Sequence, residues 1–136
     1  MTSCAAAQAA ADFSQRWRRA PLLALCLALP AFAQQVRILV QSSPLAGFQF
    51  YGGKILWDEM REGDRLALIR EPDNPHDPFA IRVEWRGEKL GYLPRADNRE
   101  VAGEMDKGTP VGGRIGKMAT DPNPWKRLRV DIYIGL

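Results

Sequence analysis

The sequence predicts a mainly β fold, a small curled sheet or barrel that carries two short α-helices. After residue 34 most of the chain reads as segments in which apolar and polar residues alternate, which is the pattern of a half-buried strand. Bends rich in glycine and proline separate these segments, and the helical patterns between them are brief. The length of 136 residues, with 46% hydrophobic and 26% charged residues, is typical of one globular domain.

The N-terminal segment has the organisation of a secretory signal peptide. Arginines at 16–19 precede an apolar stretch over 20–30 and an Ala-x-Ala site at 31–33, so we expect cleavage after Ala33. The apolar stretch is shorter than the roughly 20 residues that a membrane-spanning helix needs. The sequence therefore predicts an exported protein, periplasmic or secreted, that has no membrane span and consists of a single domain over residues 34–136.

Cleavage at that site changes both the charge and the thiol content of the protein. The full chain carries 19 basic and 16 acidic residues, whereas residues 34–136 carry 16 and 15, so the net charge falls from +3 to +1. Cys4 and Cys26 are both removed. The mature domain can then form no disulfide, and an apolar core must hold it together, which is feasible at about 100 residues.

The first elements of the mature chain are predicted from alternation and from aromatic residues. Residues 35–42 alternate as a half-buried strand, and residues 48–51 read as a second strand segment that is rich in aromatic residues. On a strand, Phe48 and Phe50 face one side and Tyr51 faces the other, so one set is expected to meet a ligand or a helix. Residues 54–60 follow as a short helical pattern.

The central part reads as two strands around a loop, followed by a hairpin. Residues 65–71 and 79–85 are the expected strands, and a turn at 86–88 leads to a returning strand over 89–94. Gly91 inside that returning strand indicates a close approach of another backbone segment.

The C-terminal part supplies a second helix and two strands. The helix is expected to begin at Asp97 or Asn98 and to end before Gly108. Residues 111–118 read as a strand interrupted by glycines, a loop follows at 120–124, and residues 127–134 alternate as the last strand.

The loop over 70–78 is the strongest local signal in the sequence. Prolines at 72, 75 and 78 restrict its backbone, so that Asp73, Asn74, His76 and Asp77 project from a stiff frame. These side chains could simply close their own backbone turns. They could equally form a binding loop, in which Asp77 offers an acceptor and His76 a flat ring.

The same loop leaves a catalytic alternative open. Asp73, His76 and Asp77 resemble part of a metal site, such as that of a hydrolase acting on phosphoesters or acid anhydrides. No second histidine follows in the chain to complete it. We therefore expect a binding protein without a cofactor, with a divalent metal such as zinc belonging only to the hydrolase alternative.

Residues 70–78, followed by 80–83 and 87–94, closely resemble the HIRAN domain, and the resemblance spans about residues 44–136. It implies an oligonucleotide-binding-type barrel of about six strands and two helices that binds the free 3′-hydroxyl end of single-stranded DNA. Phe50 and Tyr51 match paired aromatic residues that stack on a terminal base.

The resemblance also implies roles for residues of the loop and of the returning strand. His76 and Asp77 match residues that meet the 3′ end, with Asp77 accepting from the hydroxyl group. The remaining matches are Tyr92 and Arg95, near the phosphates, and Asn74, which supports the loop.

Two positions and the net charge depart from the family pattern. Gln49 stands where a basic residue can contact phosphate, and Phe79 stands where a polar residue is usual.

The partner that the resemblance implies is the end of a nucleic-acid strand, bound by a monomer. An exported barrel that binds a protein, a glycan or an envelope component is the alternative.

Overall fold

The computed structural model describes residues 36–135, which belong to one compact unit. The predicted signal peptide over residues 1–33 lies outside the described residues. Six strands are β1 (Arg37–Pro44), β2 (Arg65–Arg70), β3 (Ile81–Trp85), β4 (Glu88–Tyr92), β5 (Val111–Met118) and β6 (Leu128–Gly135). The helices are α1 (Gly53–Leu56) and α2 (Arg95–Asp106), with 3₁₀ turns η1 (Phe48–Phe50) and η2 (Pro124–Lys126). The predicted mainly β fold with two short helices is confirmed.

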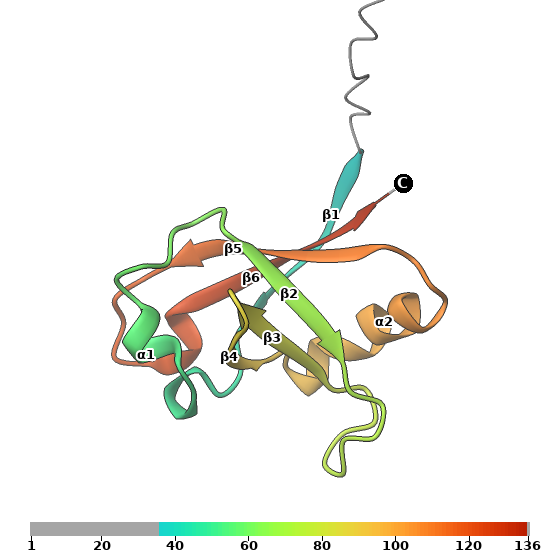
Figure 1. Cartoon of the computed structure of the whole chain (residues 1–136), viewed down its shortest axis with the longest axis horizontal. Coiled ribbons are helices and arrows are strands. Elements are labelled where there is room, and N and C mark those ends of the chain that lie inside the picture. Colours follow the sequence, from blue (N-terminus) through green and yellow to red (C-terminus); the bar gives the residue numbers. More distant parts are fainter. Residues whose placement is uncertain (1–35, 136) are drawn as a thin grey trace, which may run out of the picture. The chain divides into compact units, whose positions relative to one another are not determined.

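The strands form one antiparallel sheet in the order β1-β6-β5-β2-β3-β4, which curls strongly (Figure 1). Just after β1 the chain returns to β4, where Ala46 and Tyr92 exchange two backbone hydrogen bonds of 2.9 Å. Because β1 and β4 are the two ends of the strand order, this bridge closes the sheet into a small barrel.

Gly91 permits this closure. A Cβ atom at residue 91 would lie 2.2 Å from the carbonyl oxygen of Ala46, a distance that no side chain can tolerate. The close backbone approach predicted for this glycine is confirmed.

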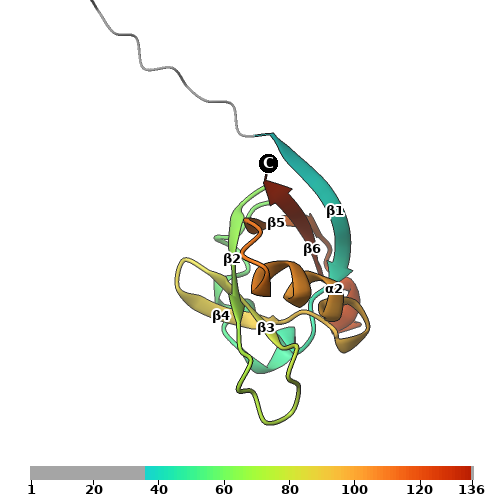
Figure 2. The ribbon, with the colours of Figure 1, turned by 90° about the vertical axis from the view of Figure 1, so that its right-hand side faces the viewer.

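The core fills the inside of the curled sheet. Alternate residues of β3 and β6 point inward and are fully buried, and Val101 and Ala102 of α2 are buried with them. Figure 2 shows α2 lying within the curve of the sheet. No helix between residues 36 and 135 is long and apolar enough to cross a membrane.

The aromatic segment after β1 differs from its predicted form. Residues 48–50 form the 3₁₀ turn η1 rather than a strand, so Phe48 is buried while Phe50 is 76% exposed. The predicted shared face of these two rings is therefore wrong. The physical reason is local: Gly47 has a positive φ of 79°, and Gly53 packs directly on the Phe48 ring, where a Cβ would lie 2.2 Å from a ring carbon.

Two helix boundaries also shift. The first helix covers only four residues, and residues 57–59 continue it as a turn in which the Glu59 amide donates to the Leu56 carbonyl oxygen three residues back. The second helix begins at Arg95, two residues before the predicted cap, because Pro94 stands at its N-cap in an extended conformation.

Candidate functional site

A cavity of about 470 Å³, which we call the loop cavity, lies where the β2–β3 loop meets the end of β4. Six of the seven sequence-predicted site residues line it. Phe50 is the seventh, and its exposed side chain lies outside the lining. The six are Tyr51, Asn74, His76, Asp77, Tyr92 and Arg95, and the rest of the lining is Ala46, Ala80, Leu93, Pro94 and Trp125.

The β2–β3 loop is held by side chains that close its own turns. Asn74 Oδ1 accepts a hydrogen bond of 2.9 Å from the His76 amide, and Asp77 Oδ1 accepts one of 2.9 Å from the Phe79 amide. Backbone bonds between Glu71 and Ala80 and between Ala80 and Asp77 close the base of the loop. The turn-closing role predicted for Asn74 and Asp77 is confirmed, and it fixes where the loop presents its side chains to the cavity.

The second oxygen of Asp77 anchors the loop to α2. Asn98 Nδ2 donates to Asp77 Oδ2 at 2.7 Å, and Arg95 Nε lies 3.9 Å from the same oxygen. Burial opposes ionisation of this carboxyl group. The hydrogen bonds from Phe79 and Asn98 and the charges of Arg95 and Arg70 outweigh burial, so the pKa of Asp77 lies below its ordinary value. Asp77 is thus a carboxylate at neutral pH, on the wall of the cavity.

Arg95 links the start of α2 to the loop. Its guanidinium group donates to the carbonyl oxygen of His76, yet 72% of its side chain is exposed. Only some of its five N–H groups are used in this way. The remaining donors are available to an anion at the mouth of the cavity.

Glu71 lies next to Tyr92, and its carboxylate connects the loop to β3 and β4. Its carboxylate accepts from Asn74 at 2.9 Å, from the Tyr92 hydroxyl group at 3.1 Å and from Arg82 at 2.9 Å. Burial raises the pKa of Glu71, but these hydrogen bonds and the charges of Arg82 and Lys89 lower it by more, so the net shift is downward. Tyr92 is therefore held by an ionised partner.

Lys89 is a residue of the site that the sequence reasoning missed. Its ammonium group donates to the Tyr92 hydroxyl group at 2.8 Å and lies 4.2 Å and 4.3 Å from the ring centres of Tyr51 and Tyr92. Burial disfavours the ammonium group, but the hydroxyl groups of Tyr92 and Tyr51 stabilise it by more, so the pKa of Lys89 is raised. The three-residue spacing of Lys89 and Tyr92 gave no signal, because in a regular strand it places the two side chains on opposite faces. The register shift of β4 opposite Val83 and Glu84 interrupts that alternation.

Trp125 is the second residue that was missed. It belongs to η2, whose cap Asn123 accepts a hydrogen bond of 3.1 Å from the Trp125 amide. The indole is 49% exposed at the edge of the cavity, far along the chain from the loop. The Pro-Asn-Pro run before Trp125 indicates a surface loop, so the sequence could suggest an exposed ring there. Only closure of the barrel brings that ring to the same cavity as Tyr51.

A cavity that binds nucleic acid should have basic residues near Tyr51, and the chain meets this requirement only in part. Arg95 lines the cavity, whereas Arg70 pairs with Asp106 at 3.1 Å and Arg82 pairs with Glu71 and Glu84. Lys54 and Arg127 line a different cavity, beside Trp57.

Core packing explains why an apolar residue, Phe79, stands at the loop position where the resemblance implied a polar one. Its ring packs against the core cluster, and the Arg99 guanidinium group lies 4.8 Å from the ring centre.

The metal-site alternative is not supported by the geometry. Asp73, His76 and Asp77 do not converge, and within residues 36–135 no group of three or more His, Cys, Asp or Glu side chains is placed to hold a metal ion. Asp73 is exposed outside the lining of the loop cavity, whereas His76 and Asp77 line it. The loop is built as the wall of a cavity instead.

Comparison with known proteins identifies the relatives of this architecture. The family model described as HIRAN domain matches residues 38–136. A solved protein from Lactobacillus plantarum is 24% identical with a TM-score of 0.62, covering 74% of this chain and 96% of that one. The HIRAN domain of human HLTF is 21% identical with a TM-score of 0.52, covering 73% of this chain and 77% of that one. These two likenesses establish the fold.

A curated relative matches over a shorter segment. The Fanconi-associated nuclease 1 homolog of Oryza sativa subsp. japonica is 40% identical over 53 residues, which is 36% of this chain. The chain spans about 6% of the length of that relative.

Proposed function

The chain belongs to the HIRAN domain family, and on that premise we propose that it is a nucleic-acid-binding module whose loop cavity receives the 3′-hydroxyl end of a single strand. The observation that carries the proposal is the grouping of the Tyr51 and Trp125 rings with the Asp77 carboxylate in one cavity. The name of the rice relative, a nuclease homolog, supports nucleic acid as the ligand class.

Aromatic rings at the edge of the cavity suit a terminal base. Stacking a base on an aromatic side chain contributes about 1–3 kcal/mol and tolerates any sequence, because every base has a π face. Tyr51 is held by the Lys89 ammonium group and by an edge-on contact with Tyr92 at 6.3 Å between ring centres. A ring fixed in this way loses little freedom when a base stacks on it.

Asp77 supplies the discrimination between strand ends. A carboxylate has about four lone-pair positions, of which the Phe79 amide and Asn98 occupy two, so a sugar hydroxyl group can still donate to it. Such a charge-assisted hydrogen bond is stronger than a neutral one. A 3′-phosphate or a continuing phosphodiester offers no hydroxyl group and places negative charge beside Asp77, which disfavours binding.

The proposal is tested by fluorescence anisotropy with the full chain and 5′-labelled single strands ending in a 3′-hydroxyl or a 3′-phosphate. We expect at least tenfold tighter binding of the 3′-hydroxyl strand, about 1.4 kcal/mol. Tyr51→Leu weakens binding of both strands, whereas the matched Tyr51→Phe retains the ring and the affinity. Asp77→Asn removes the preference between ends, and Asp73→Asn, an exposed acid of the same loop, leaves it unchanged.

Equal affinity of the wild-type protein for the two ends would contradict end recognition. The absence of binding to either strand by a folded protein would instead favour a protein, glycan or envelope ligand in the same cavity.

We also propose that the protein is exported, because residues 16–33 carry the basic, apolar and Ala-x-Ala parts of a secretory signal. Mass spectrometry of protein recovered from expressing cells tests this directly. A mature species that begins at Gln34 is expected, and a species that retains residues 1–33 in every cell fraction contradicts export.

A further inference from the structure

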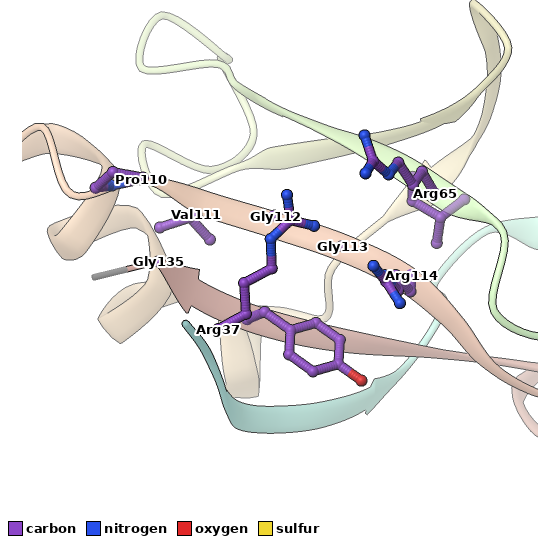
Figure 3. Close-up of a pocket in the computed structure, with 10 residues that line it drawn as sticks. Arg37, Arg65, Pro110, Val111, Gly112, Gly113, Arg114 and Gly135 are labelled. Carbon is purple, nitrogen blue, oxygen red and sulfur yellow. The ribbon is translucent and has the colours of Figure 1, made fainter. Parts of the chain in front are cut away.

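A second cavity, of about 230 Å³, crosses β1, β6, β5 and β2 on the outer face of the sheet (Figure 3). We call it the arginine groove, because Arg37, Arg65 and Arg114 line it together with Tyr133. None of its lining residues is acidic, and none of them lines the loop cavity.

Two of the arginines are direct neighbours across the sheet. Arg65 of β2 and Arg114 of β5 are paired in the strand register, and like charges directly opposite one another destabilise a sheet. Asp131 of β6 faces Arg114 in the register of β5 and β6, but its carboxylate lies over Gly116. Neither arginine forms an ion pair with an acid in the described part of the chain. An anionic ligand between the two guanidinium groups would relieve that repulsion.

The floor of the groove is partly aromatic. Tyr133 is paired with Gly112 in the register of β5 and β6, and the Arg114 guanidinium group lies 5.8 Å from the Tyr133 ring centre. A Cβ atom at Gly112 would meet nothing within 4 Å, so packing does not require glycine there. Because Gly112 has no side chain, bare backbone lies beside the Tyr133 ring. Figure 3 shows the Arg37 side chain reaching over β5 at Gly112.

We propose that the arginine groove binds internal nucleotides of single-stranded nucleic acid, with Arg65 and Arg114 on the phosphates and a base against Tyr133. Guanidinium groups match phosphate with paired hydrogen bonds, and a ring next to a bare strand accepts a planar base. A sulfated glycan would use the same arginines, but its puckered sugars cannot stack face to face on the ring as a planar base does. The inference goes beyond the proposed function, because it assigns a different set of residues and needs no strand end.

A circular single-stranded oligonucleotide isolates this groove, because it has no end for the loop cavity to bind. Anisotropy is measured with the full chain between about 50 and 200 mM salt. The wild-type protein binds the circle with a salt-dependent affinity. The double variant Arg65→Gln/Arg114→Gln should lose two phosphate contacts. The slope of log affinity against log salt should then flatten by about 1.4, since each phosphate contact to a single strand contributes about 0.7.

Matched variants distinguish the effect of the groove arginines from a general effect of net charge. Arg65→Lys with Arg114→Lys retains most of the salt slope, as does Arg86→Gln with Lys107→Gln, which removes the same charge at exposed positions outside the groove. Tyr133→Leu lowers affinity for the circle by about tenfold. Gly112→Glu abolishes binding by placing a carboxylate in the groove, and it serves as the test if the double glutamine variant does not fold.

The outcomes for the two sites are distinguishable. A protein that binds the 3′-hydroxyl strand but not the circle overturns the groove and leaves end recognition standing. A protein that binds the circle through Arg65 and Arg114 without preferring a 3′-hydroxyl supports the groove and contradicts end recognition. Heparin binding equal to that of the circle, unaffected by Tyr133→Leu, overturns nucleic acid as the ligand of the groove.

Discussion

Asn98, a buried residue of α2, donates a hydrogen bond of 2.7 Å from its side-chain amide to Asp77 Oδ2 in the β2–β3 loop. Together with the contacts of Arg95, this hydrogen bond joins the loop to the helix, and it fixes the carboxylate on the wall of the loop cavity. Stability and end recognition should therefore depend on Asn98 although it does not line that cavity.

Asn98→Ala should lower the free energy of unfolding by about 1–3 kcal/mol, because Asp77 then loses a donor in a partly buried place. Urea unfolding at pH 7 measures this change. Asn98→Asp should be at least as damaging at pH 7, since it sets two carboxylates against each other, and should recover part of its stability as the pH falls toward 4. A neutral effect of both substitutions would show that the loop does not depend on Asn98.

The acid dependence of stability should carry a component from Asp77. Its pKa is lowered in the folded state, so the stability that it contributes is fully present above the unfolded pKa and is lost as the pH falls through the folded pKa. The difference in unfolding free energy between wild type and Asp77→Asn should be largest above about pH 5 and should shrink below about pH 4. A difference that stays constant between pH 2 and 7 would be the contrary result.

Lys89 should matter through its charge on the two tyrosine rings. Lys89→Gln should lower the free energy of unfolding by about 0.5–2 kcal/mol and weaken binding of a 3′-hydroxyl strand, because Tyr51 loses the cation above its ring. Lys89→Arg keeps the charge and should retain most of both quantities. Denaturant unfolding and anisotropy on the same samples compare them, and equal behaviour of the two variants would show that charge is not the cause.

Closure of the barrel should fail when a side chain is added at Gly91. Gly91→Ala places a Cβ 2.2 Å from the Ala46 carbonyl oxygen and should cost more than about 3 kcal/mol. Gly112→Ala is the matched control, since a Cβ there meets nothing within 4 Å and should leave stability unchanged or slightly higher. Thermal unfolding of both variants by circular dichroism tests the contrast.

Trp125 should report occupancy of the loop cavity. Its indole is exposed at the cavity edge, whereas Trp85 is buried and Trp57 packs against Phe48 at 5.6 Å between ring centres. Addition of a 3′-hydroxyl strand should quench the tryptophan fluorescence of the wild-type protein, and Trp125→Phe should remove most of that signal while retaining stacking. An unchanged quench in Trp125→Phe would place the ligand elsewhere.

The sequence by itself determined the strands around the proline loop and the loop's own turns. Apolar runs on either side of the loop predict β2 and β3, and alternation predicts β6 because side chains in a one-sided sheet must alternate. Asn74 and Asp77 close turns through contacts within a few residues. The prediction of a strand over the aromatic segment was wrong, because glycines at 47 and 53 let the chain fold back into η1.

Only the tertiary structure decided the composition of the two cavities. Lys89 and Trp125 reach the loop cavity because the Ala46–Tyr92 bridge closes the barrel, and Arg65 faces Arg114 because β2 pairs with β5. Local patterns determine which residues can form a strand, since the alternation lies within that strand. Which strands pair is set by burial of the shared core, a property of segments far apart in the chain.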